Sequence, residues 1–330
     1  MFLCFNILNM MSNAIKKFAE QFSYEPVIEN GKIKKYKKYL LSGMGGSHLA
    51  ADLARIYDTA LPLIIRSDYD LPKMLKHEHK DSLFIASSYS GNTEEIIDAL
   101  NIALAENIPS VVISTNGKLI EIAKQNNLPY IQLPNTGIQP RLALGYQLKA
   151  LFKVLGREKS LAESSKLAKT LNPAGLEKDG KKLAQKMKDF IPIIYSSREN
   201  KAIAYNWKIK FNETGKIPAF YNVFPELNHN EMTGFDVKDS SKHLSANFFF
   251  IFLKDSDDHP KISERMDIVK KLYKDRGLKV EMMELKGNKL EKIFSSLLLA
   301  DWTAVYTAEL YGLESEQVPM VEEFKQLIKT

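Results

Sequence analysis

Four hydroxyl side chains fall within the stretch SSYSGNTEE, at residues 87–95. They belong to Ser87, Ser88, Ser90 and Thr93. An apolar run, SLFIA, precedes the stretch and a helix-periodic pattern follows it, which predicts a strand-to-helix junction. The start of a helix presents unpaired N–H groups and partial positive charge, so hydroxyls there suit a phosphate monoester. A polar, well-capped turn without a ligand is the alternative.

A nucleoside triphosphate site of the P-loop type is not indicated. The stretch contains no lysine or arginine, and neither GxxxxGKS nor GxxxxGKT occurs in the chain. A second glycine-rich turn, SGMGGSH at residues 42–48, has GxGG spacing and not the full GxGxxG dinucleotide fingerprint. Turns that follow neighbouring strands of a parallel sheet lie side by side, so we expect GMGGS and SSYSGNT to enclose one phosphate together.

Short apolar runs alternate with helix-periodic segments in both halves of the chain, which predicts βαβ units. The strands read as nearly unbroken Val, Ile and Leu, as is typical of parallel sheets covered on both faces. We therefore predict an α/β protein with two doubly wound domains, each a mostly parallel sheet flanked by helices. The predicted organisation is an N-terminal extension with a first helix at residues 1–34, a first domain at 35–156 and a second at 157–330.

The second half also has an apolar strand that leads into serines and a helix, IIYSSRENKAIA. Its composition predicts that it corresponds to FIASSYSGNTEEI of the first half. Because SSREN lacks the glycine and the threonine of SSYSGNT, a single phosphate site is expected, in the first domain. Helical segments are predicted over residues 141–155 and, with a break at Asn172-Pro173, over residues 157–190.

Composition indicates a soluble protein and a cytoplasmic location. The 330 residues carry a formal charge of +6 and contain one cysteine, Cys4, which excludes an intramolecular disulfide. No segment approaches eighteen uninterrupted apolar residues, so no membrane partner is expected. The apolar residues 1–11 are predicted to be a disordered or weakly packed extension. The lysine-rich run GKIKKYKKYLL, at residues 31–41, is interpreted as a solvated edge and not as a nucleic-acid surface.

The motifs together resemble a known family. GMGGS followed by SYSGNTEE resembles the SIS (sugar isomerase) phosphosugar-binding fold. Residues 211–235, FNETGKIPAFYNVFPELNHNEMTGF, are similar to the corresponding block of the bifunctional phosphoglucose/phosphomannose isomerases. The resemblance covers residues 35–330. It implies two SIS-type domains, a homodimer with a shared active site, and interconversion of fructose 6-phosphate with glucose 6-phosphate, mannose 6-phosphate or both, within glycolysis and gluconeogenesis.

Aldose–ketose isomerisation moves a proton between C1 and C2 through a cis-enediol. It needs a base, a group that opens the sugar ring and charge stabilisation, without a metal or a redox cofactor. With the resemblance, Glu213 is the candidate base and His229 the candidate for ring opening, supplied by the partner subunit. We expect Asn228, Asn230 and Glu231 to orient that histidine. Arg141, after a proline at a helix start, is the candidate for stabilising the enediolate.

The resemblance also implies the phosphate contacts. By motif position these are Gly46, Ser47, Ser88, Ser90 and Thr93. Strand alternation predicts that Ser87 points away from Ser88.

Two positions depart from the family pattern. His48 follows the GMGGS turn, where it either adds bulk beside the phosphate or begins the helix. Some members of the family carry a lysine in the long helix near the C-terminus. Here residues 301–312 contain no lysine, and Tyr306 falls near the position where that lysine is expected. His77 and His79 are interpreted as parts of a solvated loop and not as metal ligands.

Two other functions stay open at this point. One is a non-catalytic sugar-phosphate-binding regulatory protein, because this fold also serves as a ligand sensor. The other is an isomerase or deaminase of amino-sugar phosphates.

Overall fold

The computed structural model describes residues 10–72 and 81–328. The predictions made for residues 1–9, and those for His77 and His79, lie outside the described residues. A helix already runs from residue 10, and Met11 is buried. Met10, beside it, is 58% exposed, so among the described residues the packing begins at Met11.

The chain forms two compact units. The first unit is Lys17–Leu171, and the second joins the described residues up to Lys16 with those from Asn172 onward. The division falls after Leu171 and not after Gly156. The reason is that helices α7 (Glu158–Ser165) and α8 (Leu167–Thr170) pack against α6 (Leu144–Val154) and the 3-10 helix η1 (Phe18–Ser23), all within the first unit.

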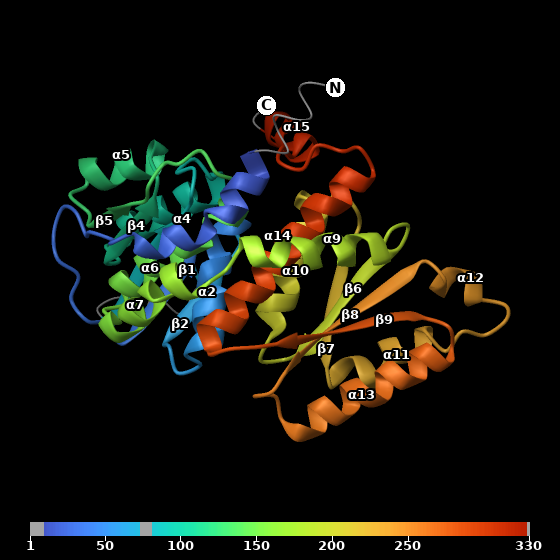
Figure 1. Ribbon diagram of the computed structural model, residues 1–330. Helices are drawn as coiled ribbons and strands as arrows, with labels where there is room; N and C mark the ends of the chain where they lie inside the picture. The colour runs from blue at the N-terminus through green and yellow to red at the C-terminus, as the bar shows by residue number, and fades with distance from the viewer. Residues whose placement is uncertain (1–9, 73–80, 329–330) are drawn as a thin grey trace. The chain divides into compact units, whose positions relative to one another are not determined.

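The first unit is built on a five-stranded parallel sheet with the order β2-β1-β3-β4-β5. Every residue of β3 and β4 is buried, which explains their unbroken apolar sequences. Helices lie on both faces of the sheet (Figure 1). The elements are β1 Lys38–Ser42, α2 Gly46–Tyr57, β2 Leu63–Arg66, β3 Ser82–Ser87, α4 Glu94–Ala105, β4 Ser110–Ser114, α5 Gly117–Gln125, β5 Tyr130–Gln132, the 3-10 helix η3 Pro140–Leu142, and α6.

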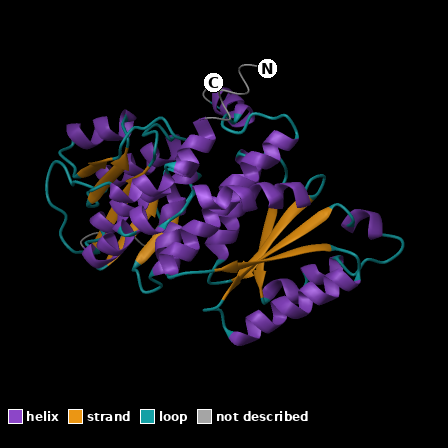
Figure 2. Cartoon of the chain, viewed as in Figure 1, coloured by secondary structure: helices purple, strands orange, loops and turns teal. Residues whose placement is uncertain are grey.

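The second unit holds a four-stranded parallel sheet with the order β7-β6-β8-β9 (Figure 2). An aromatic cluster of Tyr195, Phe224, Phe250, Phe252 and Tyr273 fills the core on one face. The elements are η4 Ala174–Leu176, α9 Glu177–Lys186, β6 Ile191–Ser197, α10 Lys201–Glu213, β7 Phe220–Phe224, η5 Glu226–His229, α11 Glu231–Gly234, α12 Lys242–Ser245, β8 Phe248–Asp255, α13 Pro260–Asp275, β9 Lys279–Leu285, α14 Lys289–Leu310 and α15 Pro319–Leu327. The predicted α/β class with two parallel sheets is confirmed.

The two sheets share one topology, and this corrects the pairing of their turns. In each unit the first strand (β1 or β6) lies inside the sheet and the second (β2 or β7) lies beside it at the edge. The third strand (β3 or β8) pairs with the other side of the first. The turn after β6, SSREN, is therefore the counterpart of GMGGS and not of SSYSGNT. The counterpart of SSYSGNT is the turn after β8, residues 256–259. Serine content suggested the wrong pairing because it does not report strand order.

No helix in the described parts of the chain combines the length and the apolar character that a bilayer crossing requires.

Candidate active site

The two predicted phosphate turns meet at the carboxyl ends of β1 and β3. The Ser47 hydroxyl accepts a hydrogen bond from the Tyr89 amide at 2.9 Å. The Ser87 hydroxyl donates to the Ser47 carbonyl oxygen at 3.0 Å. The predicted adjacency of the turns is therefore confirmed, and the Ser87 hydroxyl bonds to the backbone of the GMGGS turn, whereas Ser88 lies beside the hydroxyls of Ser90 and Thr93. This place, between β1 and β3, is the topological switch point of the sheet.

Three of the predicted hydroxyls gather around Ser88. Its oxygen lies 2.7 Å from that of Thr93 and 3.5 Å from that of Ser90, and it accepts from the Gly91 amide at 3.2 Å. Helices α2 and α4 both begin here, and neither N-cap residue makes a side-chain cap hydrogen bond. Hydroxyls and backbone N–H groups at two helix starts make a neutral donor set suited to an oxyanion.

A third turn supports this loop, and the sequence reasoning missed it. Gly91 has φ of +73°, and a Cβ there would lie 1.8 Å from the Asn116 carbonyl oxygen. The Thr115 hydroxyl donates to the Tyr89 carbonyl oxygen at 2.7 Å. Only glycine fits at residue 91 against this backbone. The signal in the sequence was STNG, a polar run with glycine directly after the β4 strand.

Arg141 is buried, with 2% of its surface exposed. It lies in the 3-10 turn η3 that precedes α6, whereas the sequence predicted a helix from this residue onward. A Cβ on Gly46 would lie 2.9 Å from the Arg141 backbone nitrogen and 2.8 Å from the Pro140 carbonyl carbon. The absence of a side chain at Gly46 therefore lets the Arg141 turn pack against the start of α2, next to Ser47. One guanidinium N–H donates to Gln139 at 3.4 Å.

The two departures from the expected pattern have structural roles. His48 belongs to α2, where its Nδ1 lies 2.7 Å from the Asp52 carboxylate one helical turn away. Tyr306 stacks on Trp302 and donates to Glu177 at 2.8 Å. Burial and the Glu177 carboxylate raise the pKa of Tyr306, so this side chain is neutral at physiological pH and does not replace a lysine's charge.

Glu213 and His229 belong to the second unit and flank one strand. Glu213 is the last residue of α10 and is half-buried; the Asn212 amide donates to the Ile217 carbonyl oxygen at 3.0 Å and closes the turn into β7. His229 ends η5, which follows β7, and is exposed. The five residues of β7 span about 17 Å. Within one chain the two side chains therefore lie toward opposite ends of the sheet.

The turn that carries His229 is fastened through Glu231. The hydroxyl of Tyr195, on β6, and the amide of Asn222, on β7, both donate to the Glu231 carboxylate. Burial, then the neighbouring Tyr273 and Glu231, raise the pKa of Tyr195, so it remains a donor. These residues lie far apart in the sequence, and no local pattern signalled their contact.

The expected orientation of His229 by its neighbours is not what the hydrogen bonds show. Asn228 accepts from Arg265 at 3.3 Å, Asn230 donates to Glu226 at 2.9 Å, and Glu231 bonds to the strands. The neighbours hold the backbone of the turn and leave the imidazole exposed. Over residues 10–72 and 81–328, no group of three or more His, Cys, Asp or Glu side chains is arranged to hold a metal ion.

Comparison with known proteins relates the chain to sugar-phosphate enzymes. Residues 176–328 match the family of the bacterial phospho-glucose isomerase C-terminal SIS domain. The chain is 33% identical to a bifunctional phosphoglucose/phosphomannose isomerase of Aquifex aeolicus (strain VF5), over 96% of this chain and 97% of that protein. It is 36% identical to the protein of the same name from Caldicellulosiruptor bescii, over 90% of this chain and 91% of that protein.

A solved structure shares the fold at low sequence identity. It is the C-terminal domain of glucosamine-fructose-6-phosphate aminotransferase from Francisella tularensis, with a TM-score of 0.63 and 15% identity over 96% of each chain. This likeness supports the two-sheet architecture alone.

Proposed function

Because the chain belongs to the bifunctional phosphoglucose/phosphomannose isomerase family, we propose that it interconverts fructose 6-phosphate with glucose 6-phosphate, mannose 6-phosphate or both. The observation that carries the proposal is the cluster of Ser88, Ser90 and Thr93 hydroxyls beside the Ser47 turn, at the switch point of a parallel sheet. Such a neutral donor set suits the dianion of a phosphate monoester.

The sugar chemistry is assigned to three side chains. His229 protonates the ring oxygen and accepts the proton of the anomeric hydroxyl, which opens the ring. Glu213 takes the proton from C2 of the aldose and returns it to C1, giving the ketose. The positive charge of Arg141 stabilises the enediolate between these two steps. The proton removed from carbon is returned to carbon, so the reaction consumes no co-reactant.

The placement of Glu213 and His229 favours a site shared between two subunits. One sugar is much shorter than the roughly 17 Å that β7 places between them, so a single protomer does not present both to one substrate. His229 is exposed and its turn is fixed to the sheet through Glu231, as expected of a side chain that is donated to another chain. We assign Glu213 of one protomer and the histidine of a second to each site, which requires at least a homodimer.

The isomerase activity is tested by an NMR time course with fructose 6-phosphate and purified protein. Appearance of glucose 6-phosphate or mannose 6-phosphate, with exchange of the C2 proton into D2O, supports the proposal. Glu213→Gln should abolish the exchange and leave binding of the sugar phosphate intact. Binding of fructose 6-phosphate without any aldose would instead indicate a regulatory sugar-phosphate binder. Turnover confined to glucosamine 6-phosphate would indicate an amino-sugar enzyme.

The shared site is tested by mixing two inactive variants. Glu213→Gln and His229→Ala subunits, after verified exchange, should recover about a quarter of wild-type activity, because half of the dimers are hybrids and each hybrid has one intact site. Exchange without recovery would place both side chains in the same protomer's site or remove one of them from the reaction.

A further inference from the structure

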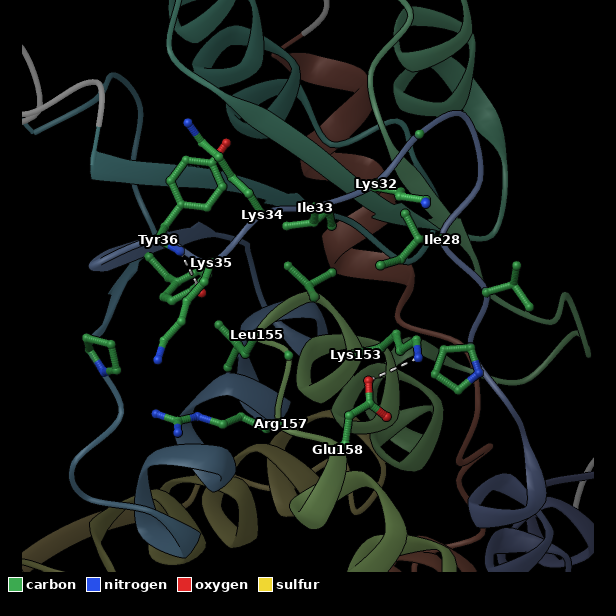
Figure 3. Close-up of a pocket in the computed structure, with 17 residues that line it drawn as sticks. Ile28, Lys32, Ile33, Lys34, Lys35, Tyr36, Lys153, Leu155, Arg157 and Glu158 are labelled. Carbon is green, nitrogen blue, oxygen red and sulfur yellow. Dashed lines mark hydrogen bonds and ion pairs between the residues drawn. The ribbon is translucent and has the colours of Figure 1, made fainter.

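The first unit contains a cavity at the end of the sheet opposite the phosphate turns. Its volume is about 820 Å³, within the range of small-molecule sites. It is lined by residues 26–28 and 31–36, by Tyr39 at the start of β1, by Pro62 before β2, and by residues 153–158 at the end of α6 (Figure 3). The lysine-rich run that the proposed isomerase does not use is exposed, as the sequence predicted, and it also forms one wall of this cavity.

The cavity is strongly basic. Lys32, Lys34, Lys35, Lys153 and Arg157 line it together with one carboxylate, that of Glu158. The Glu158 carboxylate lies 3.1 Å from the Lys153 ammonium group, so its negative charge is balanced by that lysine. In Figure 3 the charged ends of Lys35 and Arg157 lie on one side of the cavity, away from the Lys153–Glu158 pair. Across the described residues, neither of these two cations forms an ion pair within 4.0 Å, so both are available to an anion.

The remaining wall is apolar and aromatic. Ile28, Ile33, Val154 and Leu155 form the apolar part, with Tyr36 and Tyr39 in edge-to-face contact, 6.3 Å between ring centres. Lys34 lies 5.2 Å above the Tyr36 ring. A hexose phosphate, whose body is a polyol, does not match such a wall. A ligand with a planar apolar ring system and several negative charges does.

The cavity is separate from the candidate active site. It opens at the amino end of β1, whereas GMGGS follows its carboxyl end. The five residues of β1 place about 17 Å between the two. One hexose phosphate does not span that distance, so the cavity needs its own ligand.

We propose that this cavity binds a nucleoside polyphosphate. The phosphates contact Lys35 and Arg157, with Lys32 and Lys34 adding positive potential, and the base lies on the apolar wall beside Tyr36. Two or more phosphates are required, because a single monoester leaves most of the cations without a counter-charge. The site does not depend on the isomerase assignment, since it shares no residue with it.

Calorimetric titration of the full chain without divalent metal tests the proposal. ATP, inorganic tripolyphosphate and adenosine are the probes, and a single-stranded RNA hexamer is the competing class. We expect saturable ATP binding with one site per chain, weakened about tenfold in Lys35→Gln/Arg157→Gln, which loses two charge-assisted contacts. Lys124→Gln, on the exposed face of α5 and outside the cavity, is the control for loss of a surface cation and should bind as wild type. Thermal unfolding of each variant verifies that it is folded.

Four outcomes would overturn the proposal. They are an absence of ATP binding, equal weakening in the Lys124→Gln control, tripolyphosphate binding as tight as ATP, and RNA binding in preference to ATP. The third would show recognition of charge without a base, and the fourth a nucleic-acid surface. ATP binding that persists while fructose 6-phosphate is not turned over would support the cavity and count only against the isomerase.

Discussion

The two units place very different side chains at the same topological position. At the first switch point, between β1 and β3, the loop offers uncharged hydroxyls and backbone N–H groups. At the second, between β6 and β8, Asn200 donates to Asp255 at 3.1 Å and to Asp258 at 3.3 Å, and also bonds to Ser197. The second junction therefore already contains carboxylates where the first would accept a phosphate.

A lysine completes the second junction, which we call the acidic junction: Ser197, Asn200, Asp255, Asp258 and Lys292. Lys292 lies 2.6 Å from Asp255 and 2.7 Å from Asp257, and it is buried. Burial opposes its charge, but the hydrogen bonds and charges of the two aspartates raise the pKa of Lys292 overall. The donors at this position are thus satisfied internally, and an incoming dianion would meet like charge. The sheet topology therefore provides a switch point in both units, and the side chains at that switch point determine whether it can bind a phosphate.

Breaking the acidic junction should produce the largest change, and it should be a change in stability. Lys292→Met leaves the Asp255 carboxylate buried without its cation, which should lower the free energy of unfolding by about 3–5 kcal/mol. Urea titration followed by tryptophan fluorescence measures it. The control is Lys254→Met, which removes the more exposed pair with Asp267 and should cost about 1 kcal/mol or less. Equal losses in the two variants would mean that the acidic junction is not specially stabilising.

A carboxylate introduced into the first junction, like those of the second, should greatly reduce its activity toward fructose 6-phosphate. Ser90→Asp places a carboxylate on an exposed position of the phosphate loop, and like-charge repulsion should lower kcat/KM for fructose 6-phosphate about 100-fold. Ser90→Asn has nearly the same shape without the charge and should lose far less. If the two variants behave alike, the loss is steric and the phosphate does not lie against Ser90.

A smaller effect is expected where the first junction meets Arg141. A methyl group on Gly46 would lie 2.8 Å from the Pro140 carbonyl carbon, so Gly46→Ala should displace η3 and lower kcat/KM about tenfold. Gly234→Ala is the control, because a Cβ there meets no atom within 4 Å. If Gly46→Ala leaves kcat/KM unchanged, the position of the Arg141 turn does not matter for the reaction.

The smallest effect concerns pH and the acidic junction. Burial is the main cause that raises the pKa of Asp258, with the charges of Asp255 and Glu199 acting in the same direction. A carboxyl whose pKa is higher in the folded state binds its proton more tightly there, so its contribution to stability falls as pH rises above its usual value of 3.8. The stability of the wild type relative to Asp258→Asn should therefore decline from pH 4 upward. Urea midpoints measured at several pH values test this, and a flat difference would contradict it.

Local patterns predicted the elements and the first junction well, because strand periodicity and turn composition are short-range signals. The hydroxyl loop and its contact with the GMGGS turn followed from two such signals and a parallel sheet. The role of Gly91 was visible only once Asn116 was found against it, since the clash comes from another turn.

The parts that failed depend on long-range pairing. Lys292 and Asp255 meet across 37 positions of the chain, and no periodicity connects them. The serines of SSREN suggested a second copy of SSYSGNT, but strand order makes them the counterpart of GMGGS. The boundary was predicted at a glycine, whereas the packing of α7 and α8 on α6 and η1 moves it to Leu171.

The position of β7 between Glu213 and His229 has a genetic consequence when sites are shared. A wild-type subunit paired with a Glu213→Gln/His229→Ala subunit has no working centre, because its own glutamate faces a missing histidine and its own histidine a missing glutamate. A singly altered partner spares one centre of the two. With equal amounts of the two chains, the doubly altered allele should therefore leave about a quarter of the normal activity and a singly altered allele about half, so the doubly altered allele is dominant negative.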